Sequence, residues 1–82
     1  MKTVAIVARS YAEANDYALV MEEMEPGFKA KSVNIVSERD IRGYRDLECH
    51  LIGRYTDNPA WNIICEDIRH RGFKCKEVFD WR

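Results

Sequence analysis

The sequence predicts a small α/β fold built on a mostly parallel β-sheet, and three observations support this prediction. Residues 3–8, TVAIVA, form a short apolar run that is typical of a strand buried on both faces. This run leads almost directly into a helix start at Ser10. Strand-like and helix-like segments then alternate along the 82 residues, which is the pattern of a parallel sheet with crossover helices.

The first predicted helix is marked at both of its ends. Ser10 stands three residues before Glu13, the spacing of a capping box in which the hydroxyl accepts from a first-turn amide and the carboxylate reaches back. Pro26 and Gly27 end the helix. The apolar side chains that recur at helical spacing between these ends are Ala14, Tyr17, Ala18 and Met21. We therefore expect one face of this helix to pack on the sheet.

The middle of the chain predicts two strands joined by a short connection. Residues 31–36 alternate in polarity and are rich in β-branched side chains, so we expect a strand that ends at Ser37. Ser37 and Asp40 repeat a cap-like spacing, and residues 38–42 are interpreted as a single helical turn. Residues 47–52 form the third predicted strand.

The second long helix has the clearest boundaries in the sequence. Asp57 and Asn58 can cap it, Pro59 suits its first position, and Gly72 closes it. Its sheet-facing stripe consists of Trp61, Ile64, Cys65 and Ile68. A last strand follows over residues 73–79, where two lysines alternate with apolar residues, as suits the edge of a sheet.

These elements predict one domain over residues 1–82, with four mostly parallel strands in the spatial order 2-1-3-4 and two main helices. Right-handed crossovers to either side of the first strand give this order, which makes a truncated doubly wound sheet of the Rossmann or flavodoxin-like class. One alternative stays open. If the connection before residues 47–52 is a hairpin-like return, that strand runs antiparallel and the sheet order changes.

Composition argues against several classes of partner. A formal net charge of −1, from 13 basic and 14 acidic side chains, gives no long-range field for a polyanion, so we expect no nucleic-acid partner. The first apolar run is too short for a secretory signal or a membrane span, so we expect a cytoplasmic protein with no membrane partner. The three cysteines fall within apolar patterns and are expected to be reduced core thiols.

A ligand crevice is predicted beyond the carboxyl ends of the strands. An arginine follows each of the first three strands, and a guanidinium beside a helix amino terminus can bind a phosphate or a carboxylate. The candidate ligand-binding residues are Arg9, Ser10, Ser37, Arg39, Arg54 and Tyr55. The alternative interpretation is that these are solvated loop residues balanced by nearby acids.

No catalytic signature accompanies this crevice. The turn over residues 8–11, ARSY, lacks the glycines of a dinucleotide site, and the lysine loop of nucleotide triphosphatases is also absent. The cysteines and histidines do not have the spacing of metal ligands, and no cysteine stands at a helix start. We therefore expect no catalytic residue, no metal site and no cofactor.

Aromatic residues are more numerous than a sheet of this size can easily cover. Trp61 falls in the predicted core stripe of the second helix. Tyr44 and Trp81 are the candidates for a protein interface, because Tyr and Trp are favoured interface anchors and Trp81 follows the last predicted strand.

Three short motifs stand at the turns of the predicted fold. They are Val7-Ala8-Arg9 before a helix with Ala14 and Tyr17-Ala18, then Ser37-x-x-x-Ile41-Arg42-Gly43, then Gly53-x-Tyr55-x-x-x-Pro59. Over about residues 3–70, the chain thereby resembles small α/β proteins encoded by tailed phages of actinobacteria. The resemblance implies an intracellular phage product that acts by contacting a host protein, and it implies no established activity, cofactor or catalytic residue.

The sequence favours a small non-enzymatic interaction module that binds a host or phage protein through exposed aromatic and arginine side chains. The alternative is a binding domain or minimal enzyme for a phosphorylated small molecule at the arginine-lined crevice. A homodimer is the third hypothesis, because an isolated chain of this length buries little more apolar surface than the ordering of its backbone costs.

Overall fold

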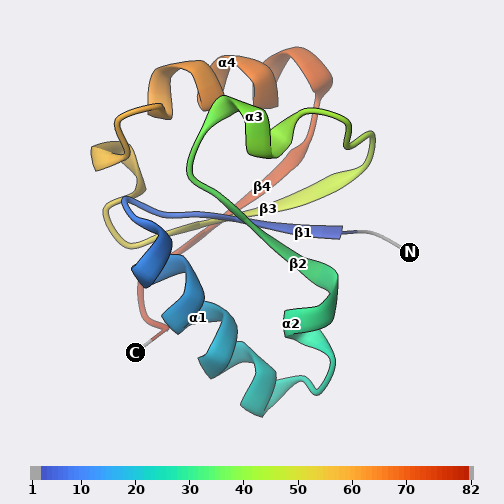
Figure 1. Cartoon of the computed structure of the whole chain (residues 1–82), viewed down its shortest axis with the longest axis vertical. Helices are drawn as coiled ribbons and strands as arrows, with labels where there is room; N and C mark the ends of the chain where they lie inside the picture. The colour runs from blue at the N-terminus through green and yellow to red at the C-terminus, as the bar shows by residue number, and fades with distance from the viewer. Residues whose placement is uncertain (1–2, 82) are drawn as a thin grey trace.

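Four parallel strands form one sheet in the order β2-β1-β3-β4 (Figure 1). The structure is a computed structural model that describes residues 3–81, apart from the side chain of Glu38. The strands are β1 (Thr3–Val7), β2 (Ser32–Ile35), β3 (Leu47–Ile52) and β4 (Lys74–Val78). The predicted strand order is confirmed, and β3 runs parallel to β1, so the antiparallel alternative is wrong.

Helices cover both faces of the sheet and give a three-layered structure. The helices α1 (Tyr11–Met24) and α2 (Phe28–Lys31) lie on one face. The other face carries α3 (Glu38–Ile41) and α4 (Trp61–Arg71), and a 3-10 helix, η1 (Tyr55–Asp57), precedes α4. Figure 1 looks onto the β2 edge of the sheet, with α4 above the strands and α1 below them.

Two hydrophobic cores follow from the alternation of side chains along the strands. In β1, Ala5 and Val7 belong to the core beneath α4, whereas Val4 and Ile6 belong to the core beneath α1. All four residues are buried, which is why this strand reads as a continuous apolar run. The prediction of a central strand is therefore confirmed.

The two long helices bury part of each predicted stripe, whereas Met21, Trp61 and Cys65 are only half-buried. The buried helical residues are Ala14, Tyr17 and Ala18 in α1 and Ile64 and Ile68 in α4. At the start of α1, the Ser10 hydroxyl accepts a hydrogen bond from the backbone N–H of Glu13 at 3.3 Å. At the end of α4, Gly72 takes the left-handed conformation with φ of +68° and stops the helix as predicted.

A short helix that the sequence did not predict, α2, separates α1 from β2. Its first residue, Phe28, is only 1% exposed and anchors this turn in the core beneath α1. The carboxylate of Glu22 accepts backbone N–H bonds from Gly27 at 3.0 Å and from Lys29 at 2.6 Å. Lys31 therefore ends a helix, and the second strand begins one residue later than expected.

The edge strand β4 exposes Lys74 and Lys76, which agrees with the prediction for its lysines. The expectation that all three cysteines lie in the core is confirmed for Cys49 only: Cys65 is half-buried and belongs to neither core, and Cys75 of this strand is exposed. An edge strand is packed on fewer sides than a central one, and that explains the difference. Among the described residues, no helix has the length and hydropathy that crossing a bilayer requires.

Candidate functional site

The predicted crevice lies at the carboxyl edge of the sheet, between β1 and β3. These two strands are neighbours, and their connections leave toward opposite faces, to α1 and to α4. Ligands of open α/β sheets bind at such a switch point. The geometry here therefore decides whether the chain has room for a small ligand.

The carboxylate of Glu13 fills one side of this switch point. Its Oε2 pairs with Nε of Arg9 at 2.9 Å, and its side chain is only 12% exposed. Its Oε1 lies against Gly53, at the position that a β-carbon on this glycine would occupy. The predicted reach of Glu13 back to its own helix cap is thus replaced by contacts with Arg9 and Gly53.

The side chain of Asn58 fills the other side. It is 4% exposed, its Nδ2 donates to the carbonyl of Ala8 at 2.7 Å, and its Oδ1 accepts from the N–H of Ala60 at 2.8 Å. The residue therefore ties the end of β1 to the segment before α4. The sequence predicted Asn58 as a cap for a helix starting at Pro59, but α4 begins at Trp61 with Ala60 at its N-cap, and Asn58 Oδ1 accepts within the turn before the helix.

The amino end of α3 is also occupied by the chain's own acid. Asp40 Oδ2 accepts from the backbone N–H of Val36 and of Ser37, each at 3.0 Å, and from the Ser37 hydroxyl at 3.2 Å. Both the backbone N–H and the hydroxyl of Ser37 therefore donate to a carboxylate of the protein itself. The other predicted serine, Ser10, is engaged by the N–H of Glu13.

The remaining predicted ligand residues face solvent or pack on neighbouring rings. Arg39 on α3 and Arg54 before η1 are exposed, and Arg9 is half-exposed beside Glu13. Because Arg9 leads into α1 and Arg39 lies in α3, these two arginines belong to elements on opposite faces of the sheet. The predicted residues therefore share an edge of the sheet but do not all lie on one of its faces.

Three aromatic rings form a column at the same edge, next to β4. Tyr55 packs edge-to-face on Trp61 with centroids 4.8 Å apart and stacks with Phe79 at 6.4 Å. The Tyr55 hydroxyl donates to Oε1 of Glu77 at 2.8 Å, and this hydrogen bond raises the pKa of the phenol. The last ring, Phe79, is 60% exposed.

This aromatic column is continuous with the arginines of the switch point. The backbone N–H of Gly53 donates to the carbonyl of Val78 at 3.3 Å, which holds the residues after β3 beside those after β4. Gly53 also contacts Glu13, the partner of Arg9. We call the surface formed by Arg9, Arg54, Tyr55 and Phe79 the rim surface.

The two residues predicted for an interface lie elsewhere. Trp81 is half-buried and packs edge-to-face on Tyr17 at 5.4 Å, where it extends the core beneath α1. Tyr44 is also half-buried against the core beneath α4, and its carbonyl accepts from Arg71 at 3.0 Å. The exposed ring at the edge of the sheet, Phe79, was missed because alternation placed it inside the last strand.

Buried titratable groups lie on both faces of β3. His50 contacts α1 through a hydrogen bond of 2.7 Å between its Nδ1 and the Tyr17 hydroxyl, and burial lowers its pKa. Cys49, on the face toward α4, is paired in register with Cys75, and burial raises its pKa to about 12. Among the side chains that the structure describes, no three from His, Cys, Asp or Glu are arranged to hold a metal ion.

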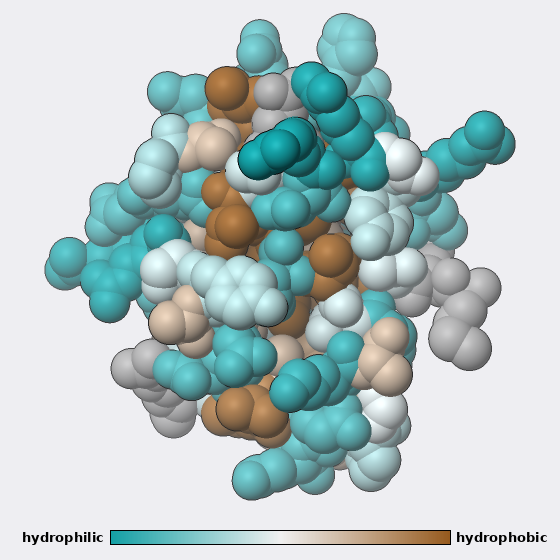
Figure 2. All heavy atoms as spheres, in the orientation of Figure 1, coloured by the Kyte–Doolittle hydropathy of each residue, from teal (hydrophilic) through white to brown (hydrophobic). Residues whose placement is uncertain are grey.

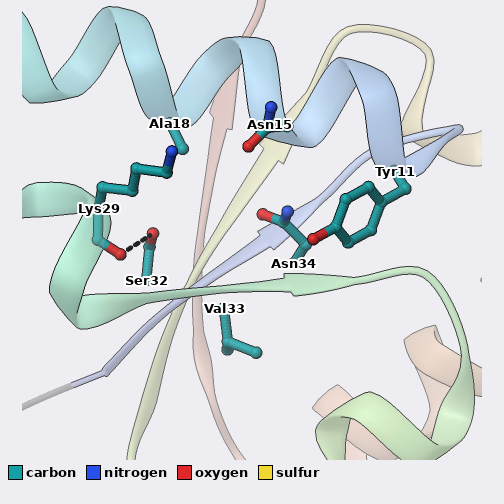
Figure 3. Close-up of a pocket in the computed structure, with 7 residues that line it drawn as sticks. All are labelled: Tyr11, Asn15, Ala18, Lys29, Ser32, Val33 and Asn34. Atoms are coloured by element: carbon teal, nitrogen blue, oxygen red, sulfur yellow. Dashed lines mark hydrogen bonds between the residues drawn. The ribbon is translucent and has the colours of Figure 1, made fainter.

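A groove of about 330 Å³ lies apart from the rim surface, between α1 and β2 (Figure 3). Its lining residues are Tyr11, Asn15, Ala18, Lys29, Ser32, Val33 and Asn34. The sequence does not predict this groove, because its residues come from three separate elements and share no motif. Comparison with protein-family models, with curated proteins and with solved structures finds no match to this chain.

Proposed function

We propose that the chain is a non-enzymatic interaction module that binds another protein through the rim surface. The single observation that carries this proposal is the exposed ring of Phe79, which stacks on Tyr55, itself packed on Trp61. Tyr, Phe, Trp and Arg are enriched at protein interfaces, and side chains already ordered before binding lose less entropy on association.

The protein's own side chains fill the switch point, which favours a protein partner over a small phosphorylated ligand. A phosphate site needs hydrogen-bond donors that are not already paired with the protein's own carboxylates. Here Glu13 already pairs with Arg9, and Asp40 already accepts from the backbone N–H and the hydroxyl of Ser37. A protein partner needs only the outer surface of these groups. Following the resemblance to phage proteins, we propose the cytoplasm as the location and a host or phage protein as the partner.

A photocrosslinking experiment tests this function. A benzophenone amino acid at position 79 is expected to capture a partner from a lysate of an actinobacterial host, whereas the same probe at position 63 is not. Ile63 is the matched control because it is 48% exposed and lies two residues after Trp61 on α4, so its side chain leaves the helix on nearly the opposite side from the aromatic column. The captured protein is then purified for direct binding measurements.

Binding of the purified partner supplies the decisive result. Phe79→Ala is expected to weaken binding by about thirtyfold, the effect of losing an interface anchor worth about 2 kcal/mol. Arg54→Ala should weaken binding to a smaller extent, and Ile63→Ala should leave it unchanged. Equal affinity for Phe79→Ala and the parent protein would remove the basis of the proposal.

The competing small-molecule function has its own test. If the crevice binds a phosphorylated ligand, inorganic phosphate or a nucleotide raises the melting temperature of the parent protein but not that of Arg9→Ala. Our proposal predicts no rise in either protein. Light scattering of the isolated chain distinguishes the third hypothesis, since a homodimer has twice the mass of the chain.

A further inference from the structure

We propose that the groove between α1 and β2 binds an extended acidic peptide segment of a partner protein, which adds a strand to the sheet beside β2. This site is separate from the rim surface, so the proposal stands or falls independently of the function proposed above. Three features of the described residues carry it: the open edge of β2, the polar groove beside that edge and an ammonium group inside the groove.

The groove runs along the backbone of β2. Three consecutive residues of this strand line it, Ser32, Val33 and Asn34, although successive strand side chains point to opposite faces. Figure 3 shows Asn34 directed toward α1 and Val33 directed to the other side of the strand. Val33 can therefore contribute mainly through its backbone, and a ligand in the groove lies next to the strand edge.

The β2 edge is suited to accept a further strand. In the described sheet β2 is the terminal strand and pairs only with β1, so its outer N–H and C=O groups have no strand partner. The sequence of β2, SVNI, contains no charged residue, whereas the opposite edge strand β4 exposes Lys74, Lys76 and Glu77. Charges of that kind discourage strand addition, and only the β2 edge lacks them.

Lys29 supplies the charge complementarity. Figure 3 shows its side chain extended along the groove toward Ala18 of α1. Two acids near it are engaged: Glu22 accepts two backbone N–H bonds, and the charge of Lys29 lowers its pKa further, whereas Glu25 pairs with Nζ of Lys31 at 2.6 Å. In the part of the chain that the structure describes, no carboxylate lies within ion-pair distance of the Lys29 ammonium.

The two faces of an added strand would meet different surfaces. One face would meet Lys29, Asn15 and Tyr11, which offer an ammonium, an amide and a phenol. The other face would meet Val33, which packs against the core beneath α4. Figure 2 shows hydrophobic residues at the centre of the β2 edge, surrounded by hydrophilic ones. A segment in which acidic and apolar residues alternate fits this arrangement.

The test uses the full chain and a fluorescein-labelled peptide of alternating glutamate and valine. Fluorescence anisotropy is expected to show saturable binding, and the amide signals of residues 32–35 are expected to shift in heteronuclear NMR spectra. A peptide of alternating glutamine and valine should bind about tenfold more weakly, because it lacks the charge that pairs with Lys29. N-methylation of every second backbone amide removes the N–H groups along one edge of the peptide. Two acidic peptides can be made in this way, methylated at odd or at even positions, and at least one of them should not bind.

A matched pair of charge reversals locates the site. Lys29→Glu is expected to weaken binding of the acidic peptide by about tenfold, and Lys74→Glu on β4 should leave it unchanged. Both lysines are exposed, so each variant should fold, and the dispersion of the NMR spectrum verifies this.

Four outcomes overturn the proposal. The first is the absence of any saturable binding of the acidic peptide. The second is an equal loss of affinity in Lys29→Glu and Lys74→Glu. The third is a shift of the β2 amides with protein concentration alone, which would assign the edge to a second copy of the chain. The fourth is an equal set of shifts with succinate alone, which would assign the groove to a small carboxylate.

Discussion

The carboxylate of Glu13 occupies the space that a side chain on Gly53 would need. Gly53 itself has φ of +53°, in the left-handed region that favours glycine. The glycine is therefore required twice, by its backbone conformation and by the acid packed against it. Since Glu13 also pairs with Arg9, this contact joins the start of α1 to the end of β3 across the switch point.

Replacement of Gly53 by alanine should destabilise the fold by more than its backbone conformation explains. A left-handed alanine costs about 1–2 kcal/mol, and displacement of Glu13 should add about 1 kcal/mol or more. Gly72→Ala is the matched control, because Gly72 has φ of +68° and no atom within 4 Å of an added β-carbon. Urea unfolding measures both free energies, and equal losses would show that the Glu13 contact is readily relieved.

Asn58 should be the most sensitive polar residue at the switch point. Asn58→Asp replaces the amide that donates to Ala8 with a carboxylate, so a buried carbonyl loses its donor and faces a negative charge. We expect a loss of about 2–4 kcal/mol in the free energy of unfolding. Asn62→Asp, on the exposed face at the start of α4, should leave stability unchanged or slightly higher. A similar, small effect of the two substitutions in thermal unfolding would contradict this role for Asn58.

The sequence predicted the regular parts of the fold because they repeat a pattern. The apolar run of β1 and the helical stripe around Tyr17 each extend over several residues, so one ambiguous position does not hide them. The turn at Phe28 has four helical residues and no period, and only its burial against the core stabilises it. No local pattern of that length separates such a helix from a loop.

The candidate site was predictable in its position but not in its chemistry. Parallel strands bring their carboxyl ends to one edge, and this correctly placed Arg9 and Arg54 at that edge. The sequence could not show that Glu13 reaches Gly53 or that Asn58 reaches Ala8, because these contacts join residues far apart along the chain. Such tertiary contacts decide whether a predicted crevice is open, and here they fill it.

His50 should make stability depend on pH below neutrality. Burial lowers its pKa from 6.5, Lys76 lowers it further, and the charges of Glu48 and Glu25 oppose this shift. The Nδ1 atom of His50 also shares a hydrogen bond of 2.7 Å with the Tyr17 hydroxyl. Because the folded state holds this proton less tightly than the unfolded state, the free energy of unfolding should fall as pH decreases from 6.5 toward the lower folded pKa.

Urea titrations over this range of pH should show that slope, and a His50→Gln variant should lose most of it while starting from a lower stability. His70→Gln removes an exposed imidazole at the end of α4 and controls for the substitution. A parent protein whose unfolding free energy is flat between pH 5 and the reference value of 6.5 would rule out a titrating His50 in this environment.

Cys49 and Cys75 should differ strongly in their reaction with iodoacetamide. Cys49 is fully buried, and burial together with the neighbouring Cys75 thiol raises its pKa to about 12, so almost none of it is the reactive thiolate at pH 8. Cys75 is exposed at the sheet edge, although burial of its thiol also raises its pKa, so it should react more slowly than a cysteine in a short peptide. Mass spectrometry of native protein should therefore find Cys49 unmodified when Cys75 is labelled.

In guanidinium chloride both cysteines should react at the same rate, because unfolding removes the difference in burial. Modification of Cys49 at the native rate of Cys75 would mean that β4 separates from β3 on the timescale of labelling, in conflict with the paired edge described above.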